Sequence, residues 1–271
     1  MSGYIHGTSP EEQHRLTLMN ELANAGSLRE LGLSGGERVL EMGAGLGQFA
    51  RAMARATGRT VVGIENSVEQ IERAHAMARD DGEPGLIDLR RGDALDPPLR
   101  PEEWGSFDVV HARFLLEHLA EPGAAVRAMV RAARPGGRIV LEDDDHDLLR
   151  LWPEPAGMAR VWDAYMESYR RLGCDPLIGR KLPRLLHEAG ATPRRATWIF
   201  FGGCAGDPMF PIVLANLNGV LSGARDAIAA TGRAGAEDVD RALAAFSAWS
   251  EEPGAGFGLA IAWAEGVKPA A

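Results

Sequence analysis

Between residues 37 and 143, short runs of β-branched and apolar residues alternate with amphipathic stretches of helical spacing. The expected strands span residues 37–42, 60–65, 86–91, 107–112 and 137–143, and the expected helices span residues 47–58, 67–80 and 121–134. Parallel strands need crossover connections, and right-handed crossovers place helices on both faces of a sheet. The alternation therefore predicts an α/β fold with a doubly wound, Rossmann-like sheet.

The flanking segments extend this prediction. Ser9-Pro10-Glu11-Glu12 is a capping box with proline at the first helical position, and it opens a helix expected to run to about Gly32. Beyond Asp147 the pattern changes to helical insertions. These are expected at about 148–176 and 208–250, with a helix at 178–190 and strands at 194–202 and 257–267. We therefore expect seven strands in one sheet, divided into an N-terminal helical segment (1–34), a core (35–147) and the remainder of the sheet (148–271).

Composition excludes several classes of protein. The net charge is −9 at pH 7, and an acidic chain lacks the basic face that nucleic-acid binding requires, so no nucleic-acid partner is expected. No apolar run reaches the roughly 18–20 residues of a membrane span, and the N-terminus does not resemble a signal peptide, which predicts a cytoplasmic protein. Cys174 and Cys204 lack CxxC spacing, so neither a disulfide framework nor a thiolate metal site is expected. The oligomeric state stays open, with a homodimer as one possibility.

The stretch VLEMGAGLGQFA, residues 39–50, places Gly43, Gly45 and Gly47 where a strand turns into a helix. Glycine lets the backbone approach a ligand closely. The dinucleotide fingerprint GxGxxG would place its third glycine at position 48, which is glutamine here. Glu41 would repel a pyrophosphate, but its carboxylate can accept a hydrogen bond from an ammonium group. The loop therefore favours a cofactor with a cationic head group.

This loop resembles motif I of the class I S-adenosylmethionine-dependent methyltransferases, E/D-x-G-x-G-x-G. Further segments are similar to the family's later landmarks and follow in the same order. They are Glu65 at the end of the second strand, Gly92-Asp93-Ala94 after the third, residues 107–119 around the fourth and residues 134–143 before and along the fifth. The strong resemblance covers about residues 30–147. Within the family, the chain is most similar in type to the small-molecule methyltransferases of quinone and natural-product biosynthesis.

The resemblance implies S-adenosylmethionine as cofactor, S-adenosylhomocysteine as product, and in-line methyl transfer to an oxygen, nitrogen or carbon atom of a small molecule. It implies that Glu65 holds the ribose hydroxyls, that Asp93 and the next backbone N–H bind adenine, and that Tyr4, with His6 as a further candidate, covers the sulfonium. The cofactor-binding residues expected in this way are Tyr4, Glu41, Gly43, Ala44, Gly45, Gln48, Glu65, Asn66, Gly92, Asp93, Ala94, Arg113 and His118.

The run LEDDDHDLL, residues 141–149, contains the candidate catalytic residue, His146, at the end of the fifth strand. An imidazole suits proton transfer near neutral pH, and Asp145 or Asp147 is expected to orient it. Asp143, Asp144 and His146 also have the right chemistry for a divalent ion, but no metal is expected, because the wider pattern of the metal-dependent catechol methyltransferases is missing.

The two insertions are expected to form a lid over an apolar or aromatic acceptor. The residues singled out there are Trp152, Trp162, Met209, Phe210 and Asn216. Two alternatives remain. One is a non-methylating or non-catalytic S-adenosylmethionine-binding protein. The other is a nicotinamide-dependent oxidoreductase, although Glu41 and Gln48 argue against it.

Overall fold

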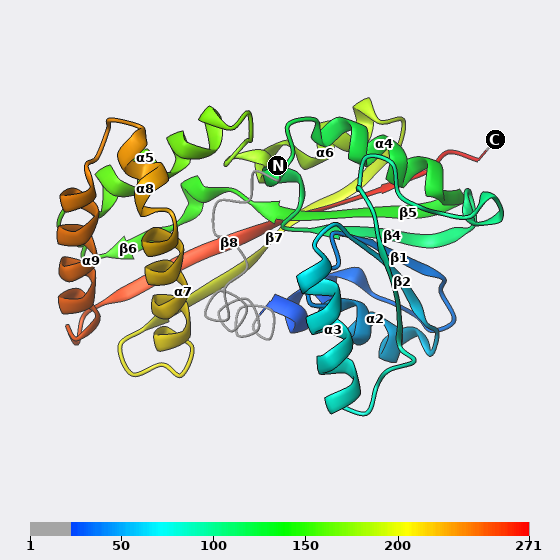
Figure 1. Cartoon of the computed structure of the whole chain (residues 1–271), viewed down its shortest axis with the longest axis horizontal. Coiled ribbons are helices and arrows are strands. Elements are labelled where there is room, and N and C mark those ends of the chain that lie inside the picture. The colour runs from blue at the N-terminus through cyan, green and yellow to red at the C-terminus, as the bar shows by residue number, and fades with distance from the viewer. Residues whose placement is uncertain (1–22, 271) are drawn as a thin grey trace.

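The computed structural model describes residues 23–270 and contains one eight-stranded sheet with helices on both faces (Figure 1). The strands are β1 (Val39–Met42), β2 (Val61–Glu65), β3 (Ile87–Arg91), β4 (Phe107–Arg113), β5 (Ala133–Asp144), β6 (Arg150–Trp152), β7 (Thr192–Cys204) and β8 (Gly256–Val267). The helices are α2 (Gln48–Thr57), α3 (Val68–Asp80), α4 (Pro122–Ala132), α5 (Met158–Arg171), α6 (Leu182–Glu188), α7 (Phe210–Gly223), α8 (Arg225–Ala230) and α9 (Ala236–Ser250). Residues 23–31 are also helical.

The strand order is β3-β2-β1-β4-β5-β8. The first five strands are parallel, and β8 runs antiparallel between β5 and β7. The order reverses next to β1, which is where open α/β sheets bind ligands at the carboxyl ends of their strands. The doubly wound sheet predicted from the sequence is therefore confirmed.

Two sequence predictions need correction. The sheet has eight strands instead of seven, because Arg150–Trp152 forms the short strand β6 within a segment that the sequence pattern assigned to a helix. This strand pairs with Gly256–Gly258 at the start of β8. It lies on the same side of β8 as β5, which pairs with the later part of that strand. Three residues are too few to carry a strand periodicity of their own, so the pairing depends on a partner about a hundred residues away. β5 also begins at Ala133, before the expected residue 137.

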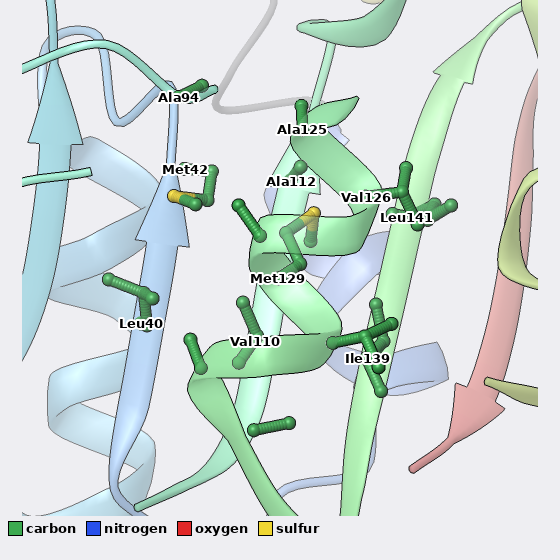
Figure 2. Close-up of a cluster of buried hydrophobic side chains, with 14 of the residues drawn as sticks. Leu40, Met42, Ala94, Val110, Ala112, Ala125, Val126, Met129, Ile139 and Leu141 are labelled. Atoms are coloured by element: carbon green, nitrogen blue, oxygen red, sulfur yellow. The ribbon is translucent and has the colours of Figure 1, made fainter. Parts of the chain in front are cut away.

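The alternating side chains of the central strands pack against different layers. On one face, Leu40, Val110 and Ile139 lie against Val126 and Met129 of α4, as Figure 2 shows. On the other face, Phe49 and Met53 of α2, together with Leu31 of helix 23–31, form a second cluster. Residues of α5, α7, α8 and α9 form a third cluster around the far part of β8. None of the helices within residues 23–270 is both long and apolar enough to span a membrane.

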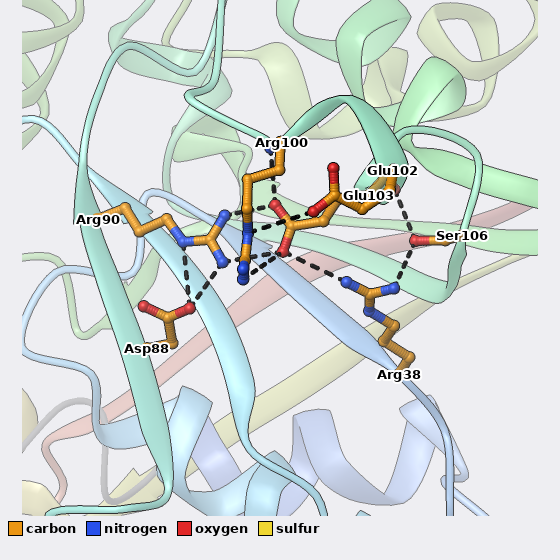
Figure 3. Close-up of polar contacts among 7 residues, drawn as sticks. All are labelled: Arg38, Asp88, Arg90, Arg100, Glu102, Glu103 and Ser106. Carbon is orange, nitrogen blue, oxygen red and sulfur yellow. Dashed lines mark hydrogen bonds and ion pairs between the residues drawn. The ribbon is translucent and has the colours of Figure 1, made fainter.

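A carboxylate secures the segment that follows β3 to the sheet (Figure 3). The side chain of Glu103 is 2% exposed and contacts three arginines: Arg90 at 2.6 Å, Arg100 at 3.2 Å and Arg38 at 3.3 Å. The hydrogen bond from Arg90 outweighs burial and lowers the pKa of Glu103 to about 2. Since Arg90 lies on β3 and Arg38 precedes β1, this cluster fixes the Gly92 to Ser106 connection across two strands.

We expect Glu103→Gln to lower the free energy of unfolding by about 1–3 kcal/mol near neutral pH, because the arginines lose a charged acceptor in a buried position. The pKa of Glu103 lies below the ordinary 4.5. Its contribution is therefore fully present above pH 4.5 and is lost as the pH falls toward about 2. Urea unfolding at neutral pH and at successively lower pH values measures the difference.

Glu102→Gln is the matched control, because the Glu102 carboxylate is 71% exposed and lies 4.0 Å from Arg100. It should change stability by less than about 0.5 kcal/mol. Equal losses for the two variants, or a Glu103→Gln deficit that does not shrink in acid, would contradict the role given to this carboxylate.

Candidate functional site

A cavity of about 1120 Å³ lies at the carboxyl ends of the parallel strands. One half is lined by the loop after β1, the end of β2 and the turn after β3, and the other by the segments after β4 and β5 with residues of α5 and α7. This is the position that the topology predicts for a ligand site. The volume is ample for two small molecules side by side.

The glycine loop enters the cavity with a left-handed backbone. Gly43 has φ +72° and Gly45 has φ +52°, values that other residues rarely adopt. A Cβ atom on Gly43 would lie 3.0 Å from Leu115, and one on Gly45 would lie 3.1 Å from the Gln70 side chain. The loop therefore needs glycine for its turn and for its close packing, and it leaves backbone facing the cavity.

Two carboxylates flank this loop. Glu41 is 3% exposed, lines the cavity, and its Oε2 has no hydrogen-bond partner among the described residues. Glu65 lines the cavity from the end of β2. Its Oε2 accepts from the Gly45 N–H at 2.9 Å, and its Oε1 accepts from the N–H groups of Asn66 and Ser67 at 2.8 Å each.

This arrangement fits the cofactor that the sequence predicts. A buried carboxylate oxygen without a hydrogen-bond donor costs free energy. The Oε2 atom of Glu41 can therefore accept a hydrogen bond from a ligand in the cavity, such as an ammonium group. The Glu65 carboxylate is held by three backbone N–H groups in one orientation toward the cavity and retains acceptor capacity for hydroxyl groups.

Behind Glu41, the sheet buries further charged groups. His111 on β4 lies with Nδ1 3.5 Å from Oε1 of Glu41 and with Nε2 3.2 Å from Oε1 of Glu142 on β5. Burial alone would lower the pKa of His111, but its hydrogen bond with Glu142 and the nearby Glu41 carboxylate raise it above the ordinary value. For Glu142, burial acts in the opposite direction and would raise the pKa. His111 and Arg113 outweigh burial, so the pKa of Glu142 is lowered.

The second half of the cavity contains His146, which follows β5. Its Nε2 lies 2.8 Å from Oε2 of Glu117, a buried residue that follows β4. Because Glu117 is a carboxylate, Nε2 donates this hydrogen bond, which leaves the lone pair of the imidazole on Nδ1. Burial lowers the pKa of His146, but the negative charge of Glu117 and its hydrogen bond prevail and raise it above 6.5.

The expectation that Asp145 or Asp147 orients His146 is wrong. Both carboxylates bind the guanidinium of Arg180, Asp145 with both oxygens at 2.5 and 2.6 Å and Asp147 at 2.9 Å. Arg180 lies 35 residues from Asp145, in the 3₁₀ turn before α6. The partner of His146 is Glu117, which sequence reasoning missed, because the two residues are 29 positions apart and meet only where β4 and β5 end together.

Aromatic rings surround His146. The rings of Trp162, Tyr165 and Tyr169 on α5 each have their centroid 5.5 Å from the imidazole centroid. The Trp162 indole N–H donates to the backbone carbonyl of His146 at 2.8 Å, and the hydroxyls of Tyr165 and Tyr169 are 2.9 Å apart. Burial, followed by the charge of Glu117, raises the pKa of Tyr169 well above its ordinary value. An aromatic face of α5 thus contacts the catalytic candidate.

One group of side chains in this half has metal-ligating geometry. Glu117, Asp144 and His146 each offer one ligand atom, and these atoms lie within 4.8 Å of one another. Asp143, which the sequence pattern included, instead accepts from the Leu116 N–H at 2.8 Å, and burial with the neighbouring carboxylates raises its pKa well above 3.8.

Most of the residues predicted for the site line the cavity. They are Glu41, Gly43, Ala44, Gly45, Gln48, Glu65, Asn66, Asp93, Arg113, His118 and His146. Gly92 and Ala94 do not line it: Gly92 packs against Pro98, and Ala94 is 8% exposed in the core. Tyr4 and His6 lie outside the described residues. Of the five residues named in the insertions, Trp162 and Asn216 line the cavity and Met209 does not. Trp152 is 77% exposed, and Phe210 is buried in the third cluster.

Comparison with known proteins agrees with this geometry. A family model described as a methyltransferase domain matches residues 40–141. A 27-O-demethylrifamycin SV methyltransferase of Amycolatopsis mediterranei is 34% identical over 169 residues, covering 61% of this chain and 58% of the relative. An uncharacterized 37.1 kDa protein in transposon TN4556 of Streptomyces fradiae is 32% identical over 57% of this chain and 43% of its own length. The chain thus spans about half the length of these two relatives.

A solved structure extends the agreement in fold to almost the whole chain. The putative methyltransferase BH2331 of Bacillus halodurans superposes with a TM-score of 0.60 at 18% identity, over 91% of this chain and 98% of that protein. With the motif I loop and its two flanking carboxylates, residues 40–141 match a methyltransferase domain, and the chain shares the fold of this putative methyltransferase.

Proposed function

We propose that this protein transfers a methyl group from S-adenosylmethionine to a hydroxyl oxygen of a largely apolar small molecule. The observation that carries the proposal is the pairing of two sites in one cavity. A glycine loop between two carboxylates occupies one half, and a histidine held by a buried carboxylate occupies the other.

Glu41 accepts a hydrogen bond from the ammonium group of the cofactor, Glu65 binds the ribose hydroxyls, and Asp93 with its neighbouring backbone binds adenine. The backbone of Gly43 to Gly45 gives the cofactor close access to the sheet. The remaining cofactor contacts are assigned to Gln48, Asn66, Arg113 and His118, all of which line the cavity. When bound, S-adenosylmethionine would supply a methyl carbon attached to a sulfonium: the acceptor oxygen would bond to that carbon as the carbon–sulfur bond breaks, and S-adenosylhomocysteine would leave.

His146 is the general base. Its Nδ1 takes the proton of the acceptor hydroxyl, while Glu117 fixes the tautomer and stabilises the imidazolium that forms. Trp162, Tyr165 and Tyr169 hold the imidazole in place and shield it from water. Orientation in such a closed site supplies much of the rate, roughly 7–11 kcal/mol in well-aligned model systems.

The acceptor is apolar over most of its surface. Its half of the cavity is lined by Leu149, Leu172, Leu217, Val220 and Leu259 in addition to the aromatic rings. The 27-O-demethylrifamycin SV methyltransferase is named for an O-demethylated rifamycin, and we place this protein in natural-product metabolism by analogy. Residues 148–176 and 208–250 act as the acceptor lid, since α5 and α7 contribute lining side chains. Cytoplasmic location and the absence of nucleic-acid binding stay predictions.

The proposal is tested by methyl-label transfer from S-adenosylmethionine into a metabolite extract, with products resolved by mass spectrometry. A labelled ether supports it. Tight binding of S-adenosylhomocysteine without any labelled product would favour the non-methylating alternative, and preferential binding of NAD would favour the oxidoreductase. Neither alternative is favoured by the family match or the relatives.

We expect Glu65→Gln to weaken S-adenosylhomocysteine binding by roughly 10- to 100-fold, the loss associated with a charged hydrogen-bond acceptor. Isothermal titration calorimetry measures the affinity. Glu72→Gln is the matched control, since Glu72 is exposed on α3 outside the cavity. Wild-type affinity in Glu65→Gln would show that the ribose lies elsewhere.

We expect His146→Gln to lower kcat by roughly 10²–10⁴-fold with little change in cofactor affinity, because it removes the base and leaves the other half of the cavity intact. The neutral imidazole is the active form and its pKa is raised, so kcat should increase with pH through a value above 6.5. Asp147→Asn is the control: Asp147 is exposed and binds Arg180, and turnover should be unchanged. A kcat that does not depend on His146 would remove it from the mechanism.

We expect turnover to be unaffected by EDTA, because His146 acts here as a base and not as a ligand. The geometry of Glu117, Asp144 and His146 makes this a direct test. Loss of activity in EDTA that Mn²⁺ or Mg²⁺ restores would instead assign these three residues to a metal ion.

A further inference from the structure

Four charged side chains alternate on one face of the central sheet. Glu41 on β1 lies directly opposite His111 on β4, and Arg113, two residues further along β4, lies opposite Glu142 on β5. Their exposed fractions are 3%, 0%, 8% and 1%. Phe49 of α2 covers the group, with its ring centroid 4.9 Å from that of His111 and 4.3 Å from the Arg113 guanidinium. Each glutamate therefore faces a histidine or arginine on the neighbouring strand, at a position buried from water.

His111 is the link between the two carboxylates. Its nitrogens face Glu41 at 3.5 Å and Glu142 at 3.2 Å, and both contacts favour the charged imidazolium in spite of burial. Glu41 has one oxygen toward His111 and the other, Oε2, unpartnered among the described residues.

We propose that His111 is a positioning residue for cofactor binding: from the adjacent strand it holds the Glu41 carboxylate in the orientation that directs Oε2 into the cavity, ready for the ammonium group of the cofactor. The inference rests on the proposed function, because it assumes that Glu41 receives that group. His111 does not itself line the cavity. It acts through Glu41 from the adjacent strand.

The same network reaches helix 23–31. Ser27 donates to Oε2 of Glu142 at 2.5 Å, and Arg113 donates to the Ser27 hydroxyl at 3.1 Å and to Oδ1 of Asn24 at 2.8 Å. These contacts fix Glu142, which in turn holds His111. Packing of the N-terminal helix and affinity for the amino-acid end of the cofactor are therefore coupled through a chain of buried polar contacts.

Two ligands separate this role from a general effect on folding. S-Adenosylhomocysteine carries the ammonium group, whereas 5′-methylthioadenosine carries the same adenosine without the amino-acid part. We expect His111→Phe, which fills the space beside Phe49 but has no donor, to weaken S-adenosylhomocysteine by at least about 10-fold and to change methylthioadenosine by less than about 2-fold. Calorimetry gives both affinities.

Two further variants sharpen the test. His111→Asn, which retains a short amide donor toward Glu41, should recover part of the lost affinity for S-adenosylhomocysteine. Ser27→Ala should weaken that ligand by about 2- to 10-fold, as expected for one neutral hydrogen bond. Wild-type affinity in Ser27→Ala would overturn the coupling to helix 23–31.

The outcomes distinguish this inference from the proposed function. If the wild-type protein binds neither ligand, the proposed function fails. If it binds both and His111→Phe weakens the two equally, His111 supports only the fold. Tighter binding of S-adenosylhomocysteine by His111→Phe would show that the imidazolium competes with the ligand for Glu41, and it would also overturn the inference.

Discussion

Charged side chains buried at the centre of a sheet are costly unless they compensate one another. In this protein Glu41, His111, Arg113 and Glu142 do so across three adjacent strands, under α2 and helix 23–31. The arrangement requires β4 to lie between β1 and β5, which is the place where the doubly wound order turns back. Strand order and the lining of the cavity are therefore linked: the crevice exists where the order reverses, and the buried charged side chains lie beneath it, with Glu41 and Arg113 at its wall.

The acceptor half depends on a second consequence of the same topology. Parallel strands end at one edge, so the segments after β4 and β5 bring Glu117 and His146 together although neither lies on a strand. Asp145 and Asp147, which are next to His146 in sequence, face Arg180 instead. Their charge is thus neutralised by Arg180, and among residues 23–270 Glu117 provides the carboxylate that is hydrogen-bonded to the imidazole. Closeness along the chain is a poor guide to partnership at such turns.

The sequence predicted what is locally encoded. Strand periodicity, turn residues and the glycine loop located β1 to β5 and their helices within a few residues, and eleven of the predicted site residues line the cavity. What it could not predict depends on contacts between distant segments. The three residues of β6 form a strand only against β8, and the Glu117 and His146 pair needs two strand ends to meet. The signal available in the sequence was a single acidic residue, Glu117, within the otherwise largely apolar stretch FLLEHL, and the structure shows that this residue is buried.

The division of the cavity also explains where acceptor specificity is encoded. The segment that matches the family model, residues 40–141, supplies the glycine loop, Glu65 and Asp93, which line the half of the cavity proposed for the cofactor. Trp162, Leu217 and Leu259 line the acceptor half from helices and a strand outside that segment. Relatives can therefore share the motifs and differ in substrate. Since α5 both lines the acceptor half and packs on His146, a change of acceptor requires α5 to be remodelled without displacing the His146 imidazole.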